Sequence, residues 1–549
     1  MELDRRSLFR VSAASLALTA CRSKGNAADE PPATPWPAWP LSRPTTVGVG
    51  LTGLPSEELV EVDIAELLHR LQTGATTSAA LVRAYTSRIA ALNETLHAVL
   101  ELNREAEAIA QTLDSERSAG KLRGPLHGIP ILVKDNIDTG DSMLTTAGSL
   151  ALADAPATRD AFVIAKLRAA GAIILGKANL SEWANLRGVQ SVSGWSARGG
   201  QCRNPYALDR SASGSSSGSA AATAASLCAA SLGSETDGSI TSPASMCALV
   251  GMKPTVGLVS RAGVIPISSS QDTVGPITRT VADAAIVLTA IAGSDPDDPA
   301  TASAKPEDYT KYLDRKALAG ARIGVPRKGW FGVLRPLDTV MTDAFAKLTE
   351  LGAILVDPVE LEIPPALAAA ESTVFLCELK PAMAAYLARR GHPKFHSLLD
   401  LIAFNLEHPE ELRLFGQEFF DQAQARPGHA DAGYAAAREQ CLQIARDQLL
   451  DTAFKANQLD AMVMVTGGLP WLIDSLTGDA IVGPNTTVLP AVAGYPHVTV
   501  PAGAFHGLPI GLSFVGLPYT EGKLFGYAYA YEQATLHRTP PRYLATAEL

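Results

Sequence analysis

The sequence predicts an α/β protein with a large mixed β-sheet core sandwiched between helices, in a single main domain with a helical insertion. Between about residues 124 and 290, short apolar runs bounded by turn residues, typical of buried strands, alternate with helix-like segments. Apolar runs of the same kind return at 461–465, 497–501 and 510–515. Strands toward both ends of the chain favour one core, and the region of about 300–460 is expected to be mainly helical.

The first 21 residues resemble an export signal and are left out of the fold. The run DRRSLF resembles a twin-arginine motif, and the apolar run after it, Val11–Ala20, is shorter than the about 20 residues that span a bilayer. Leu18-Thr19-Ala20-Cys21 resembles a lipobox, at which Cys21 would be lipidated, and an ordinary signal with a fortuitous cysteine is the alternative. We expect export to the periplasm, either free or as a membrane-anchored lipoprotein that faces the periplasm.

A proline-rich linker is expected over residues 22–56, and the folded domain over 57–549. Asp63 with Glu66 has the pattern of a capping box at the start of a helix. A longer helical region is expected from Thr76 to about Ala119, before the strand-rich core begins.

Composition excludes some classes of function. The formal net charge of −10 offers no basic surface, so no nucleic-acid partner is expected. Beyond Cys21 the chain has an odd number of cysteines without tight spacing, which indicates neither a disulfide framework nor a zinc site. We expect no metal or cofactor and regard the cysteines as small core residues. They are Cys202, Cys228, Cys247, Cys377 and Cys441.

A lysine stands at the end of a predicted buried strand, in Gly128–Lys134 (GIPILVK). Burial disfavours the ammonium form, so it would lower the pKa of Lys134 and leave a neutral amine that accepts a proton. The alternative is a strand-end lysine whose amine reaches solvent.

A Gly/Ser-rich stretch, SASGSSSGSAAATAAS, leads into what is expected to be a long alanine-rich helix. Gly214–Gly218 fits the pattern G-x-S-x-G centred on Ser216, which is typical of the nucleophile of an α/β-hydrolase. The N–H groups at the start of a helix also bind anions. A flexible linker is the alternative.

The stretch GSETDGSI contains a third candidate residue, Ser239. Gly233 and Gly238 permit unusual backbone angles close to a reacting group. The N–H groups of Thr236, Asp237, Gly238 and Ser239 are placed to form an oxyanion hole, beside which a serine hydroxyl would carry out acyl transfer.

These three stretches, in this order, resemble the amidase signature family of serine hydrolases. The matching segments are GIPILVKDN, SGSSSGS and GSETDGSI, followed by Pro243-Ala244 and by Gly251–Thr255 (GMKPT). The resemblance covers roughly residues 60–540 and is weakest in 300–460. Within the family the sequence is most similar to bacterial peptide amidases, which remove the C-terminal amide from peptides.

The resemblance implies a role for each of three side chains. Ser239 matches the acylated nucleophile, and Lys134 matches the base. Ser215 matches the bridging serine, whose preceding peptide bond is cis in the family, so the loop would act through Ser215 in place of Ser216. The sequence departs from the usual pattern at Ser213, Ser217, Asp237 and Thr241, the last standing where many members have arginine.

The activity implied is hydrolysis of a carboxamide, with a C-terminal peptide amide or a small amide as substrate, release of ammonia and no obligate protein partner. Trp183, Asn185 and Gln190 follow the predicted strand at 172–176 and are expected to line the substrate pocket. Three alternatives stay open: a glutaminase-type subunit of a tRNA-dependent amidotransferase, a non-catalytic lipid-anchored binding protein on the same scaffold, and an α/β-hydrolase that uses Ser216 with a histidine.

Overall fold

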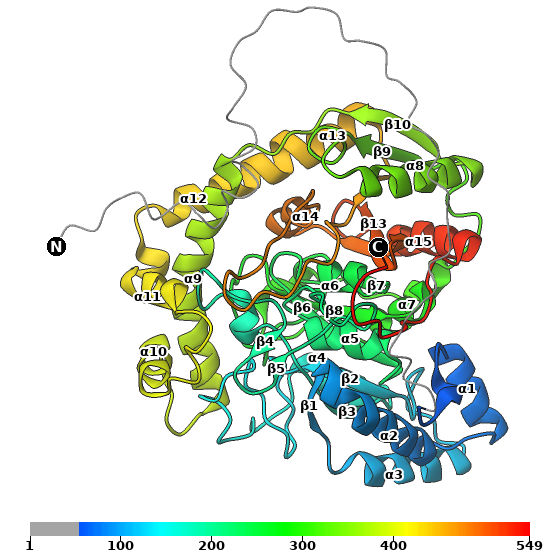
Figure 1. Cartoon of the computed structure of the whole chain (residues 1–549), viewed down its shortest axis with the longest axis vertical. Helices are drawn as coiled ribbons and strands as arrows, with labels where there is room; N and C mark the ends of the chain where they lie inside the picture. Colours follow the sequence, from blue (N-terminus) through cyan, green and yellow to red (C-terminus); the bar gives the residue numbers. More distant parts are fainter. Residues whose placement is uncertain (1–53, 549) are drawn as a thin grey trace, which may run out of the picture.

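A computed structural model describes residues 54–548 of the chain (Figure 1). The export signal expected over residues 1–21 lies outside the described residues, as does the linker expected over 22–56 except for its last three positions. Within the part of the chain that is described, no helix is long and apolar enough to cross a membrane.

The core is a single mixed sheet of eleven strands, in the order β1-β3-β2-β6-β8-β7-β12-β13-β11-β9-β10. Strand β2 runs parallel to both β3 and β6, whereas β6 is antiparallel to β8. The strands are β1 Val99–Leu102, β2 Pro130–Lys134, β3 Ile173–Ala178, β6 Ala230–Glu235, β7 Val250–Lys253, β8 Thr273–Thr278, β9 Arg322–Pro326, β10 Ile354–Val359, β11 Ala461–Val465, β12 His497–Phe505 and β13 Leu508–Val515. A separate ribbon pairs β4 Trp195–Ser196 with β5 Gly200–Gln201.

The sheet consists of two halves that are each continuous in the sequence. Six neighbouring strands come from residues 99–278 and the other five from 322–515. The halves join where β7 pairs with β12, through only three residue pairs. The catalytic candidates Lys134, Ser215 and Ser239 all belong to the first half.

Helices cover the sheet, as the sequence predicts. Helix α5 contacts β2, β3, β6 and β8, α6 contacts β7, β12 and β13, and α7 contacts β7 and β8. Figure 1 shows α9 to α13 as an arm along one side of the sheet. The helices are α1 Ile64–Thr73, α2 Ser78–Leu96, α3 Ala106–Ser118, α4 Phe162–Ala169, α5 Ser217–Ala224, α6 Thr241–Met246, α7 Val281–Ile291, α8 Arg335–Glu350, α9 Ala366–Arg390, α10 Leu398–Glu407, α11 Glu418–Ala425, α12 Tyr434–Leu442, α13 Asp451–Asn457, α14 Val488–Ala493 and α15 Glu521–Thr535.

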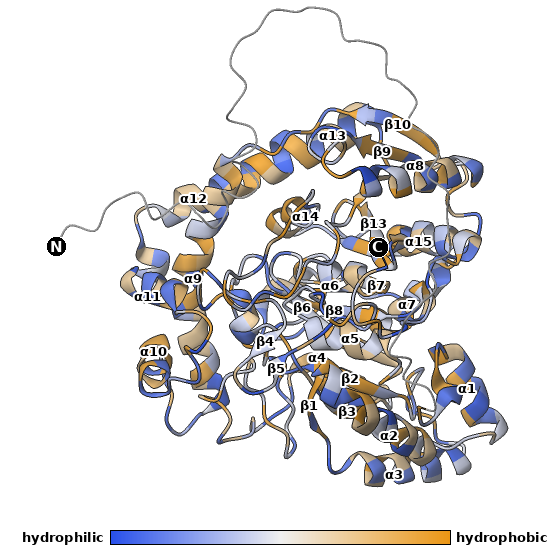
Figure 2. Cartoon of the chain, in the orientation of Figure 1, coloured by the Kyte–Doolittle hydropathy of each residue, from blue (hydrophilic) through white to orange (hydrophobic). Residues whose placement is uncertain are grey.

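Local sequence explains the ends and faces of these helices. In α1 the side chain of Asp63 accepts a hydrogen bond from Glu66 N at 2.7 Å, and the helix ends at Gly74, whose φ is +74°. Its buried residues include Leu67 and Leu71, and Figure 2 shows the hydrophilic stripe beside them.

The five cysteines beyond Cys21 are free and buried.

The helical region expected over 76–119 is wrong in its middle, because β1 interrupts it. The side chain of Asn93 accepts hydrogen bonds from Ala98 N and Val99 N at 2.9 and 2.8 Å, and His97 takes a φ of +50°. This cap ends α2 and turns the chain, so that Val99 and its neighbours pair with β3.

The long alanine-rich helix is also shorter than expected. Helix α5 ends at Ala224, and the chain turns at Ser226, with a φ of +53°, before β6 begins. The small apolar residues on both sides of this turn are fully buried, so helix and strand have the same composition here and show no periodicity that separates them. The region 300–460 likewise contributes two strands, β9 and β10, which extend the sheet.

Candidate active site

The three sequence stretches converge at the carboxyl ends of β2 and β6, which are parallel neighbours. Lys134 is the last residue of β2, and Ser234 is near the end of β6. Lys134 Nζ donates hydrogen bonds to Ser215 Oγ at 2.8 Å, to Ser234 Oγ at 3.0 Å and to the carbonyl of Ser234 at 3.1 Å. The lysine therefore links the Gly/Ser loop to the strand that precedes Ser239.

Lys134 is fully buried, which excludes the alternative of an amine that reaches solvent. Burial lowers the pKa of Lys134 to about 7, against the opposing effect of the negative charges on Glu235 and Asp272. A substantial fraction of the amine is consequently neutral at neutral pH, which a proton acceptor requires.

The Gly/Ser loop places Ser215 between the lysine and the loop that carries Ser239. The peptide bond between Gly214 and Ser215 is cis. The carbonyl of Ser215 accepts from Ser181 N at 3.0 Å, and Ser216 N donates to the carbonyl of Ser239 at 3.2 Å. A Cβ on Gly214 would lie 2.2 Å from Ser181 Oγ, so a larger residue would have to displace this hydroxyl, which accepts from Gly194 N.

The side chain of Ser216 ties the Gly/Ser loop to strand β6. Its hydroxyl donates to the carbonyl of Ser234 at 3.2 Å and accepts from Ser234 N at 3.3 Å, and the residue is fully buried. Within residues 54–548 no histidine hydrogen-bonds to it. This arrangement argues against an α/β-hydrolase that uses Ser216, because such a nucleophile is exposed on a sharp turn and paired with histidine.

Ser239 lies in a loop whose N–H groups are free. Among the described residues, the backbone N–H groups of Thr236, Asp237, Gly238 and Ser239 form no hydrogen bond to other main-chain groups or side chains. Ser239 is buried, with 9 % of its surface exposed. Unpaired N–H donors grouped before a serine are what an oxyanion hole requires.

Neighbouring residues hold this loop in place. Thr236 Oγ1 donates to Asp272 at 2.6 Å, and Thr487 Oγ1 donates to the carboxylate of Asp237. Gly238 has a φ of +77°, and a Cβ there would lie 2.9 Å from Thr487 Oγ1. The conformation and the space at this position both require glycine.

Several supporting residues were missed by the sequence analysis. Ser234 accepts from Lys134 and also from Asn136 Nδ2, at 2.9 Å. The carboxylate of Glu235 accepts from Ile240 N at 2.7 Å and Thr241 N at 2.9 Å, which fixes the start of α6. Both Ser234 and Glu235 lie inside the stretch GSETDGSI. Their position, as polar residues at the end of an apolar strand, was the feature of the sequence that could have marked them as site residues.

The three residues expected to line the substrate pocket lie in different surroundings. Trp183 is buried and packs edge-on against Phe420, with ring centroids 5.5 Å apart. Asn185 donates to Ser193 Oγ at 3.1 Å, and its Oδ1 is buried without a partner. Gln190 is exposed. Whether these side chains contact substrate stays a prediction.

The backbone around Trp183 is unusual, since Trp183, Ala184 and Asn185 have φ values of +47°, +54° and +70°. Three consecutive left-handed residues other than glycine store strain that the surroundings must offset. The fully buried Arg187 helps to hold this segment in place. Its guanidinium pairs with Glu182 at 2.9 Å and lies 4.1 Å from the centre of the Phe415 ring.

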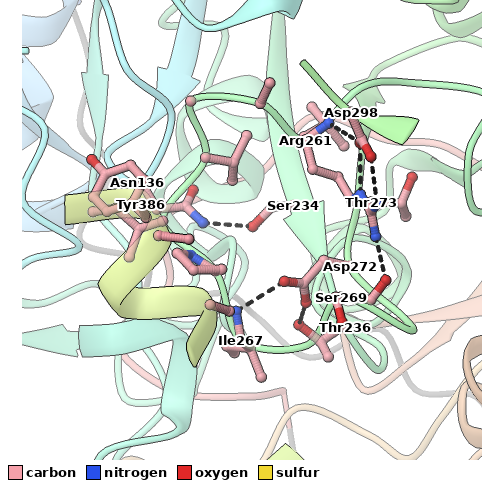
Figure 3. Close-up of a pocket in the computed structure, with 18 of the residues that line it drawn as sticks. Asn136, Ser234, Thr236, Arg261, Ile267, Ser269, Asp272, Thr273, Asp298 and Tyr386 are labelled. Atoms are coloured by element: carbon pink, nitrogen blue, oxygen red, sulfur yellow. Dashed lines mark hydrogen bonds and ion pairs between the residues drawn. The ribbon is translucent and has the colours of Figure 1, made fainter. Parts of the chain in front are cut away.

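A cavity of about 380 Å³ lies next to this segment, with Ala184 in its wall (Figure 3). Asn136, Ser234, Glu235 and Thr236 contribute to its wall, whereas Lys134, Ser215 and Ser239 do not. Among residues 54–548, no three His, Cys, Asp or Glu side chains are placed to hold a metal ion.

A fully buried lysine amine that hydrogen-bonds to one serine, beside a second serine preceded by free N–H donors, is compatible with the acyl-transfer chemistry of serine hydrolases. Residues 80–525 match the amidase family. The native peptide amidase from Stenotrophomonas maltophilia is 49 % identical, with a TM-score of 0.85 over 88 % of this chain and 99 % of that chain. The chain belongs to the amidase family, and its fold is the amidase signature fold.

Curated relatives extend this likeness beyond peptide amidases. A probable amidase of Arabidopsis thaliana is 41 % identical over 482 residues, which is 85 % of this chain and 89 % of the relative. A glutamyl-tRNA(Gln) amidotransferase subunit from Moorella thermoacetica is 34 % identical over 504 residues, which is 87 % of this chain and 97 % of that protein.

Proposed function

We propose that this enzyme removes the C-terminal amide of peptides through a Ser-Ser-Lys relay. Neutral Lys134 accepts the Ser215 proton while Ser215 accepts that of Ser239, and Ser239 Oγ bonds to the amide carbon. The N–H groups of residues 236–239 stabilise the negative charge on the carbonyl oxygen. The C–N bond then breaks, and the proton returns through Ser215 to the leaving nitrogen, which departs as ammonia.

Water completes the cycle. It attacks the ester that joins the acyl group to Ser239, passes a proton through Ser215 to Lys134, and releases the carboxylic acid as Ser239 recovers its proton. Among the described residues, Ser239 Oγ forms no hydrogen bond. The relay requires the hydroxyls of Ser215 and Ser239 to meet in the complex with substrate, where catalytic hydrogen bonds commonly tighten.

The observation that carries this proposal is the 2.8 Å hydrogen bond from a fully buried Lys134 to Ser215 Oγ. The likeness to the Stenotrophomonas peptide amidase supports a peptide amide as the substrate. An ester of the same acyl group would be compatible with the same steps, because its alkoxide leaves in place of ammonia.

The test measures ammonia release from a C-terminally amidated peptide. Ser239→Ala and Ser215→Ala are each expected to lose at least about 100-fold in kcat, whereas Ser118→Ala, on the exposed side of α3, should match the wild type. Near wild-type hydrolysis by Ser239→Ala would refute the assignment of the nucleophile.

A fluorophosphonate probe separates the alternatives. It should label the wild type and Ser216→Ala but not Ser239→Ala. Labelling that is lost only in Ser216→Ala would support the α/β-hydrolase mechanism, and a wild type that takes no label would support a non-catalytic binding protein.

The glutaminase alternative is tested by substrate and by partners. The amidotransferase subunit is less similar, at 34 % identity, than the peptide amidase, at 49 %. We therefore expect the purified single chain to hydrolyse amidated peptides much faster than free glutamine. Glutamine hydrolysis that appears only with co-purified subunits would overturn this choice.

We also propose that the enzyme is exported and that Cys21 carries a lipid anchor. The twin-arginine-like run and Leu18-Thr19-Ala20-Cys21 support this location. Fractionation of the producing bacterium should find the full-length gene product with the membranes and Cys21→Ala outside them. Recovery of both forms from the cytoplasm would refute export, and identical fractionation in the periplasm would refute lipidation.

A further inference from the structure

The carbonyl of Thr236, in the loop before Ser239, is held by a side chain from another part of the chain. Gln271 Nε2 donates to this carbonyl at 3.3 Å, and Gln271 is 1 % exposed. Strands β6 and β8 pair as far as Glu235 and Thr273, so Thr236 and Gln271 lie just beyond the last pair. The amide of Gln271 thus continues the hydrogen bonding of the sheet into the loop.

This hydrogen bond fixes the direction of a neighbouring N–H group. The peptide unit between Thr236 and Asp237 is planar and trans, so its C=O and N–H point in opposite directions. The N–H of Asp237 is one of the donors that are free among the described residues. Because Gln271 holds one end of the unit, the N–H at the other end is turned away from Gln271.

Main-chain groups hold the next carbonyls of the loop. Ser242 N donates to the carbonyl of Gly238 at 2.8 Å, and Ser216 N donates to that of Ser239 at 3.2 Å. The carbonyl of Thr236 differs, since a side chain holds it. Substitution of that side chain can therefore release one peptide unit and leave the others bound.

The residue after Gln271 holds the side chain of Thr236. Thr236 Oγ1 donates to the carboxylate of Asp272 at 2.6 Å (Figure 3). Asp272 also accepts from Ile267 N at 2.8 Å and Ser268 N at 2.9 Å, which fixes the carboxylate. Two consecutive residues consequently hold the carbonyl and the side chain of Thr236.

Helix α9 holds the segment 268–271 from the other side. Glu371 Oε1 accepts from Gln271 Nε2 at 2.9 Å, and Glu378 accepts from Ser268 Oγ at 2.6 Å. Residues seven apart lie close to the same face of a helix, so α9 presents both carboxyl groups to this segment.

The amide of Gln271 has a single consistent orientation. Both partners of its NH₂ group, the carbonyl of Thr236 and the carboxyl of Glu371, are acceptors. Burial, together with the negative charge of Asp237, raises the pKa of Glu371 well above its ordinary value. Protonated Glu371 adds no negative charge beside the loop, and glutamine can replace it with nearly the same shape.

We propose that Gln271 is a positioning residue for the oxyanion hole and that Glu371 of α9 holds its amide in place. This inference rests on the proposed function, in which the N–H groups of residues 236–239 stabilise the oxyanion. Without Gln271, the peptide unit between Thr236 and Asp237 can rotate, and the Asp237 N–H loses its aim at the oxygen where charge develops. Contacts made by the bound substrate elsewhere are unchanged.

Gln271→Met keeps the length of the side chain and removes both donors. It should lower kcat for ammonia release from a C-terminally amidated peptide at least about tenfold with KM unchanged. This is part of the about 10²–10³-fold loss that follows removal of a whole oxyanion donor. The matched control is Gln111→Met, on an exposed position of α3, which should equal the wild type. A wild-type kcat in Gln271→Met, or an effect confined to KM, would overturn the positioning role.

An aldehyde analogue of the peptide distinguishes positioning from a general loosening of the fold. Ser239 Oγ adds to the aldehyde carbon, nothing leaves, and the former carbonyl oxygen occupies the oxyanion hole. Gln271→Met should weaken inhibition by the aldehyde by the same factor as kcat/KM, with an unchanged circular dichroism spectrum. A lower kcat with unchanged aldehyde affinity would reject the proposal, because the defect would then lie outside the oxyanion hole.

Variants of Glu371 leave the segment 268–271 intact and serve as the test if Gln271→Met does not fold. Glu371→Gln retains an uncharged acceptor and should keep kcat within about twofold of the wild type, whereas Glu371→Met should lower it at least about threefold at unchanged KM. Equal kcat values in the two variants would reject the link between α9 and the loop.

The positioning role and the proposed function fail in different ways. If Ser239→Ala hydrolyses the amidated peptide as fast as the wild type, the relay is rejected, and the positioning role with it. If Ser239→Ala is inactive and Gln271→Met is as fast as the wild type, the relay stands and only the positioning role is rejected.

Discussion

Replacing Lys134 with methionine should abolish hydrolysis and at the same time stabilise the fold. Methionine has a similar length and carries no charge, so it removes the base without opening a cavity. The stabilisation is expected because a buried lysine is held at a pKa of about 7 in the folded protein, against an ordinary value of 10.5 in the unfolded chain. The unfolded state therefore binds the proton more tightly.

The size of the effect follows from that difference in pKa. Between pH 7 and 10.5 the unfolded chain carries more protons at this position than the folded one, so the stability of the wild type rises with pH. The cost of holding Lys134 is about 4 kcal/mol at pH 7 and about 2 kcal/mol at pH 9, at 1.36 kcal/mol for each pKa unit. The hydroxyls of Ser215 and Ser234 lose a donor in the variant, which subtracts about 1–3 kcal/mol at both pH values.

Pulse proteolysis in urea would measure the free energy of unfolding of both proteins at pH 7 and at pH 9. The advantage of Lys134→Met over the wild type should shrink by about 2 kcal/mol between the two. This comparison is insensitive to the lost hydrogen bonds. It is also insensitive to Lys177 and Lys253, two other buried lysines whose pKa burial lowers, since both proteins contain them. A difference that is the same at both pH values would show that Lys134 is charged in the folded state and would refute its role as a neutral base.

Three further outcomes are expected. The kcat/KM of the wild type should fall about tenfold per pH unit below a pKa of about 7, because protonated Lys134 cannot accept a proton; a flat profile down to pH 5 would contradict this. Gly238→Ala places a Cβ 2.9 Å from Thr487 Oγ1 at a φ of +77° and should lower kcat at least about tenfold with an unchanged circular dichroism spectrum. Arg187→Met leaves the buried carboxyl of Glu182 without its partner and should lower the free energy of unfolding in urea by about 3 kcal/mol; an unchanged midpoint would show that the pair is dispensable.

Much of the sheet could be predicted from the sequence because its strands are short, apolar and bounded by turns. The strand at 461–465 was predicted with its observed ends, and Gly128–Lys134 contains β2. Prediction failed where burial is uniform, as on the two sides of Ser226, since residues buried on every side show no period. It also failed for β10, a half-exposed edge strand inside a region of strong helical patterns.

The candidate site was predictable to the extent that chemistry is local in the sequence. Lys134 was found because a lysine after three apolar strand residues is anomalous. Asn136 and Asp272 were not found, because their partners are about 98 and 36 residues away and only the folded sheet brings them together. The family resemblance supplied the choice of Ser215 over Ser216, which the pattern G-x-S-x-G alone would have reversed.

The join between β7 and β12 has a consequence for how activity arises during synthesis. By the time residue 278 has left the ribosome, the chain holds every strand of the first half-sheet and the three candidate side chains, Lys134, Ser215 and Ser239. Thr487 is synthesised about 200 residues later. Its hydroxyl donates a hydrogen bond to Asp237, and its side chain packs on Gly238. The loop before Ser239 therefore gains its contact with Thr487 only when the second half of the sheet docks, so we expect full activity only once the polypeptide is nearly complete.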